Sequence, residues 1–65
     1  MIVEKMILKY QAEIALRHEN LQLFLKNPSG VPEHPDFVAT IEEQLKKIAE
    51  ITDLLEAAQD SLSFQ

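Results

Sequence analysis

The sequence contains no cysteine, no tryptophan and a single glycine among its 65 residues. The absence of cysteine excludes disulfides and thiolate metal sites, which often stabilise small domains. A chain of this length buries only about 60% of the surface that its unfolded form exposes, so a monomeric core is marginal. We therefore expect a single domain, residues 1–65, that gains stability by binding further copies of itself and holds no cofactor or metal.

Basic residues are also scarce, because six lysines and arginines accompany eleven acidic residues and the net charge is −5. A surplus of negative charge repels phosphate backbones and anionic lipid headgroups. Glu4 and Lys5 interrupt the apolar N-terminal stretch, which therefore predicts neither a signal peptide nor a membrane span. We expect a cytoplasmic protein that binds neither membranes nor nucleic acid directly.

Proline and glycine are confined to one short segment, since all three prolines and Gly30 lie between residues 28 and 35. Proline fixes its own φ, lacks a backbone N–H and disfavours the helical conformation in the preceding residue. The segment predicts a stiff Pro-rich loop at 27–34. It separates a helix at 2–26 from a second helix at 35–62, which is followed by a frayed tail at 63–65.

Both predicted helices carry an apolar stripe with alternating spacings of four and three residues, as in an amphipathic helix. The first stripe consists of Val3, Ile7, Tyr10, Ile14, Arg17, Leu21 and Phe24. The second consists of Val38, Ile41, Leu45, Ile48, Thr52, Leu55, Gln59 and Leu62, and Phe37, Ile51 and Ala58 widen it on one side. Each helix is therefore expected to turn one face toward the other.

Two helices of about 38 Å joined by a short loop predict an antiparallel hairpin. Folding the chain about Val31 pairs Phe24 with Val38. It also places Tyr10 near Thr52, where the two polar side chains can satisfy each other. The predicted fold is all-α, an antiparallel helical hairpin of two long helices.

The first helix has apolar side chains nearly all the way round, whereas the second has an acidic and polar back. One neighbouring helix cannot cover the first, and a helix of this kind is normally buried in a larger assembly. We therefore expect a homo-oligomeric helical bundle with the first helix central, a four-helix-bundle dimer or a higher bundle. The expected interface consists of Ile2, Met6, Leu8, Leu16, Leu23 and Phe64.

Two acidic groups in the second helix, Glu42-Glu43 and Glu50-x-x-Asp53, resemble part of the magnesium-binding pattern of the all-α nucleotide pyrophosphohydrolases. That pattern requires further acids on a neighbouring helix, and the first helix offers only Glu13 near its middle. The heptad positions of Glu43, Glu50 and Asp53 also direct them toward water. The sequence therefore predicts a solvated acidic face and no metal site.

Arg17 is the one charged residue on the first stripe. Its aliphatic stem can pack while its guanidinium reaches an acid such as Glu42 or an acid on another subunit. The functional alternative is a polar pocket for an anionic ligand at a subunit interface. The candidate pocket residues are Tyr10, Arg17, Asn20 and Thr52.

The sequence contains no nucleophile elbow, phosphate-binding glycine loop or dinucleotide fingerprint, and His18 and His34 lack the spacing of metal ligands. We therefore predict a non-enzymatic homo-oligomeric protein-interaction or adaptor module, an accessory factor of a bacterium or phage that binds another protein. One alternative is an inhibitor that mimics nucleic acid with its acidic back. Another is a small-molecule sponge with sites at subunit interfaces.

Overall fold

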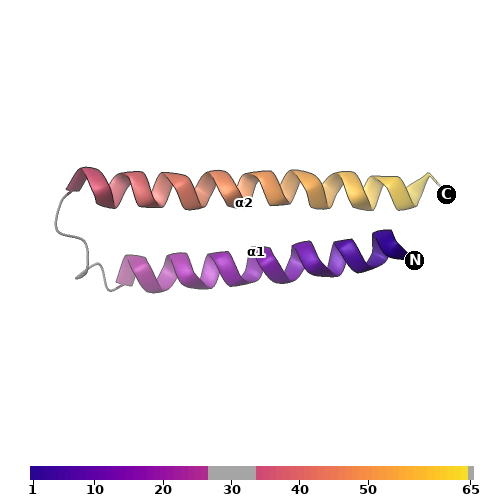
Figure 1. The fold of residues 1–65 in the computed structure, drawn as a ribbon, viewed down its shortest axis with the longest axis horizontal. Coiled ribbons are helices and arrows are strands. Elements are labelled where there is room, and N and C mark those ends of the chain that lie inside the picture. The colour runs from indigo at the N-terminus through magenta and orange to yellow at the C-terminus, as the bar shows by residue number, and fades with distance from the viewer. Residues whose placement is uncertain (27–33, 65) are drawn as a thin grey trace.

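The computed structural model describes residues 1–26 and 34–64. It contains two α-helices, α1 (Ile2–Lys26) and α2 (His34–Ser63), which pack against each other along their length. The helices are antiparallel, and the start of α1 lies beside the end of α2 (Figure 1). The predicted all-α hairpin is confirmed, and α1 has the predicted bounds. The predicted loop at 27–34 lies outside the described residues except for its last position.

α2 is longer than predicted by one residue at each end. It begins at His34 and includes Ser63, which was expected to belong to a frayed tail. The Ser63 hydroxyl donates to the carbonyl of Gln59 at 3.3 Å, and the N–H of Phe64 donates to the carbonyl of Ser61 at 3.4 Å. These bonds use carbonyl groups near the helix end, which explains why the last turn persists.

α1 contacts α2 with the stripe that the sequence predicts. All seven residues of this stripe are buried or half-buried. Leu21 is the most buried of them, and it is joined by Ile48 and Ile51 of α2. Among the described residues these three alone are buried, and each keeps 6–8% of its surface exposed, so the core is a thin line between the helices.

α2 turns toward α1 the side of its apolar surface on which Phe37, Ile51 and Ala58 were predicted to widen the stripe. Val38, Leu45 and Gln59 were placed on the predicted stripe and are exposed. The contact face of α2 consists instead of Phe37, Ile41, Gln44, Ile48, Ile51, Leu55, Ala58 and Leu62, with Thr52 half-buried at its edge. This set has the same alternation of four and three, so periodicity alone does not distinguish the two stripes.

Two contacts across the hairpin explain this rotation of α2. Phe24 stacks on Phe37 with ring centroids 5.1 Å apart, so the predicted pairing of Phe24 with Val38 is wrong. An aromatic pair of this kind contributes about 0.5–1.5 kcal/mol beyond the burial of its area. In addition, Nη1 of Arg17 donates to Oε1 of Gln44 at 3.5 Å. The predicted stripe would turn Leu45 toward α1 in place of Gln44. A leucine offers no polar partner to a half-buried guanidinium, whereas Gln44 does.

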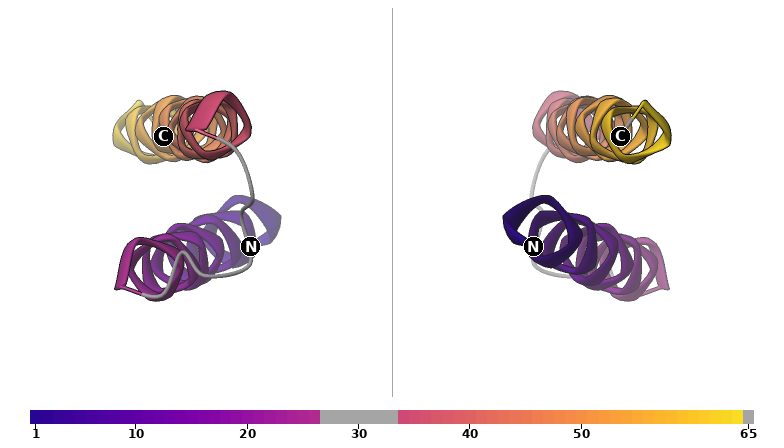
Figure 2. Two further views of the ribbon diagram at one scale, coloured as in Figure 1. Left: turned by 90° about the vertical axis from the view of Figure 1, so that its left-hand side faces the viewer. Right: turned by 90° about the vertical axis from the view of Figure 1, so that its right-hand side faces the viewer.

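The hairpin is a single layer of two helices whose axes cross at a shallow angle (Figure 2). It measures 50 × 16 × 13 Å, and its radius of gyration is 15.1 Å, against about 11 Å for a compact domain of this length. Its accessible surface of 5075 Å² is roughly 900 Å² larger than the about 4200 Å² expected of a compact protein of the same mass. The single chain therefore leaves much of its surface uncovered.

The rotation of α2 can be tested by truncating one inward and one outward residue. Ile51 is 6% exposed and Leu45 is 50% exposed. Ile51→Ala should therefore lower the free energy of unfolding by about 2–4 kcal/mol, and Leu45→Ala by less than about 1 kcal/mol. Urea denaturation followed by circular dichroism at one protein concentration measures both. A larger loss for Leu45→Ala would show that the originally predicted stripe faces α1.

Candidate functional site

Arg17 forms a polar layer across the middle of the hairpin. Its Nε lies 3.7 Å from Oε2 of Glu13, one turn earlier on α1, and its Nη1 reaches Gln44 on α2. Nε is buried and has no hydrogen-bond partner among the described residues, so the carboxylate of Glu13 is its electrostatic partner. The paired acid is therefore Glu13 and not Glu42, the example suggested by the sequence. The side chain is 31% exposed, so the guanidinium lies partly buried between the helices and partly open to solvent.

The four residues of the predicted ligand pocket do not share one groove within the described chain. Tyr10 and Asn20 line separate grooves, and ten residues of helix separate them by about 15 Å. The Thr52 hydroxyl donates to the carbonyl of Ile48 at 2.7 Å, so its proton is used within α2 and not toward Tyr10. A pocket at a subunit interface that includes these residues stays a prediction.

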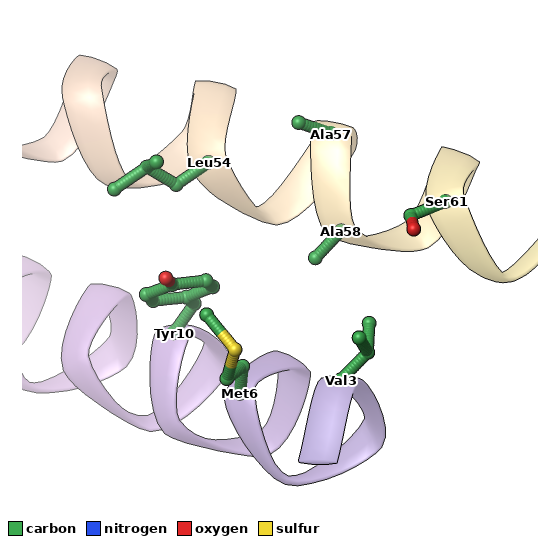
Figure 3. Close-up of a pocket in the computed structure, with 7 residues that line it drawn as sticks. All are labelled: Val3, Met6, Tyr10, Leu54, Ala57, Ala58 and Ser61. Atoms are coloured by element: carbon green, nitrogen blue, oxygen red, sulfur yellow. The ribbon is translucent and has the colours of Figure 1, made fainter. Parts of the chain in front are cut away.

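One groove of about 280 Å³ lies between the start of α1 and the end of α2. Figure 3 shows Met6 and Tyr10 extending from α1 toward α2, with Leu54 above the Tyr10 ring and Ala58 pointing toward α1. The groove is lined by Val3, Met6, Tyr10, Leu54, Ala57, Ala58 and Ser61. Its lining is apolar apart from two hydroxyl groups, which suits an apolar side chain of another protein better than a charged ligand.

A second groove of about 200 Å³ lies nearer the loop end of the hairpin. It is lined by Asn20, Leu21, Phe24, Thr40 and Gln44. Amide and hydroxyl groups stand beside the stacked ring of Phe24, so this groove has both polar and apolar walls. Gln44, which accepts the hydrogen bond of Arg17, forms part of its wall.

The six residues expected at an interface are all exposed in the single chain. Leu8, Leu16 and Leu23 share one face of α1 with Ala12, because the four residues are spaced by four, four and seven positions. All four are exposed, so this face points away from α2. We call these four residues the rear stripe. The three leucines were predicted at an interface and Ala12 was not, although its helical spacing from Leu8 and Leu16 places it on the same face.

The acidic back of α2 lies in solvent, as the sequence predicts. The exposed acids include Glu43, Glu50, Asp53 and Asp60. Oε2 of Glu50 lies 3.6 Å from Nζ of Lys47, and both side chains are largely exposed, so this pair contributes little to stability. Within the described ranges, no three or more His, Asp or Glu side chains are grouped so that they could hold a metal ion.

The chain matches no protein-family model, no curated protein and no solved structure with which it was compared. Across residues 1–26 and 34–64, neither helix combines the length and the hydropathy that a membrane span needs. The functional proposal therefore depends on the surface of the hairpin itself.

The role of Arg17 can be tested by replacing it with an apolar side chain of similar length. The partly buried charge has one buried nitrogen without a hydrogen bond, and replacing such a charge with a packed apolar residue is often neutral or stabilising. Arg17→Met should therefore raise the free energy of unfolding by about 0.5–1 kcal/mol in urea denaturation. A loss of 2 kcal/mol or more would show that the polar layer is required for stability.

Proposed function

We propose that this chain is a small non-enzymatic protein-interaction module that works as a homo-oligomer, with α1 at its centre and α2 outside. The observation that carries the proposal is the distribution of large apolar side chains. Three apolar residues of the described chain are buried, whereas eleven large ones are exposed. Exposed apolar surface on this scale is typical of sites that bind other proteins.

The area left open by the hairpin is consistent with one further interface. Its surface exceeds that of a compact protein of equal mass by roughly 900 Å². A stable protein interface of standard size buries about 800 Å² on each partner. Association with one other copy therefore supplies about the burial that the single chain lacks.

The distribution of charge supports α1 as the central helix. α1 contains four basic and three acidic residues, whereas α2 contains two basic and seven acidic residues. Two copies that meet through α2 bring their excess negative charges together, which opposes association. Two copies that meet through α1 bring together nearly neutral helices.

The groove between the start of α1 and the end of α2 is the surface best suited to a different protein. Leu54 and Met6 are exposed beside it, and its lining is largely apolar. An apolar anchor residue entering a small groove is a common source of binding energy at protein interfaces. An adaptor role follows if self-association uses the far side of α1 and leaves this groove open.

Self-association can be tested with an acidic substitution on α1 and a matched one on α2. Wild-type protein should sediment as a dimer or higher oligomer. Leu16→Glu should raise the dissociation constant at least about tenfold, because it places a charge in an apolar interface, and the released chain should lose helix content. Sedimentation equilibrium and circular dichroism measure these effects.

Leu45→Glu is the control, because Leu45 is exposed to a similar degree but lies on α2. This variant should retain the wild-type mass. A wild-type chain that is a stable, fully helical monomer at micromolar concentration would contradict the proposed function.

A further inference from the structure

We infer that two copies pair through their rear stripes, with the two α1 helices antiparallel and the two-fold axis passing Ala12. This inference rests on the proposed self-association and adds the face and the register. The rear stripe lies on the side of α1 opposite the contact with α2, and its leucines are 66%, 57% and 55% exposed at positions 8, 16 and 23. Nothing within the described chain covers them.

The arrangement of residue sizes along the rear stripe favours a close crossing at Ala12. Leu8 and Leu16 lie one turn before and one turn after this small residue. In an antiparallel pair centred on Ala12, Leu8 therefore lies opposite Leu16 of the partner subunit, twice by symmetry. The two alanines meet at the axis, where their short side chains let the helices approach closely while the leucines pack on both sides.

Charges on the same face favour the same register. Lys5 and Glu19 lie seven residues before and seven residues after Ala12, and both are exposed. Neither forms an ion pair within the described part of the chain. The pairing centred on Ala12 places Lys5 opposite Glu19 of the partner subunit at two symmetric positions. A parallel pair in register would instead place each of these charges against its own copy.

The alternative antiparallel register, shifted so that the axis passes beside Ala15, is less favourable. It places Lys5 opposite Lys26 of the partner subunit, which brings like charges together. It also places Glu19 opposite an alanine, where the carboxylate loses water without gaining a partner. The register centred on Ala12 thus combines apolar contacts with opposite charges.

Cysteine cross-linking tests the register directly, because the chain contains no cysteine of its own. Ala12→Cys places two thiols at the axis, within the distance that a disulfide spans. Ala15→Cys is the matched control, since Ala15 is also an exposed alanine of α1. In the inferred register, residue 15 of one subunit and residue 15 of the other are about 9 Å apart along the helix axis. This separation exceeds the limit of about 7 Å between the Cα atoms of a disulfide.

Mild oxidation followed by non-reducing electrophoresis should convert Ala12→Cys to a covalent dimer at least about tenfold faster than Ala15→Cys. Faster linkage of Ala15→Cys would overturn the register, and equal rates would indicate parallel helices. If neither variant links while the wild type sediments as an oligomer, the rear stripe is not the interface and only this inference fails. A monomeric wild type would overturn the proposed function as well.

Charge exchange provides a second, independent measurement by sedimentation. Lys5→Glu and Glu19→Lys should each raise the dissociation constant about tenfold, and the double variant should return it to within about threefold of wild type. Lys46→Glu makes the same charge change as the first variant at an exposed site on α2 and should have little effect. If the double variant does not restore association, Lys5 does not lie opposite Glu19 of the partner subunit.

Discussion

The contact between two helices in a single layer limits how much of this protein can be buried. Each helix has one neighbour, so only one side of each is covered, and three residues of the described chain become buried. The elongated shape and the exposed leucines both follow from this geometry. Three aliphatic side chains are few against the entropy lost when two long helices become ordered. The need for further burial is therefore a property of the architecture and not of any single residue.

The rotation of α2 is set by two contacts that agree with each other. Arg17 and Phe24 are seven residues apart on α1, and their partners Gln44 and Phe37 are seven residues apart on α2. Both pairs are therefore satisfied by one alignment of the antiparallel helices. The polar pair contributes little net stability, but a shift of α2 that separates it leaves a half-buried guanidinium with fewer partners. We interpret this layer as a determinant of alignment, while the aromatic pair and the buried aliphatic residues supply the attraction.

The sequence predicted the hairpin, the bounds of α1 and the seven stripe residues with which α1 contacts α2, because their alternating spacing continues without a break from Val3 to Phe24. On α2 it predicted seven of the eight contact residues, but it also placed Val38, Leu45 and Gln59 toward α1 and missed Gln44. The predicted and observed stripes share Ile41, Ile48, Leu55 and Leu62 and differ at the positions between them, so the choice depends on chemistry across the hairpin that a period cannot contain. Within one chain Tyr10 and Asn20 line separate grooves, because ten residues of helix lie between them, so the candidate pocket at a subunit interface stays a prediction.

The unequal charge of the two helices would limit the size of the proposed assembly. In a dimer joined through α1, each rear stripe is covered by the other, and the outer surfaces belong to α2 with its excess of five negative charges. A third copy that approaches an outer surface meets this repulsion instead of an apolar stripe. A two-fold interface that uses the same patch on both copies is also closed by its own symmetry, so it leaves no unpaired patch for further growth. Neutral inner helices and acidic outer helices together therefore favour a finite assembly over a filament.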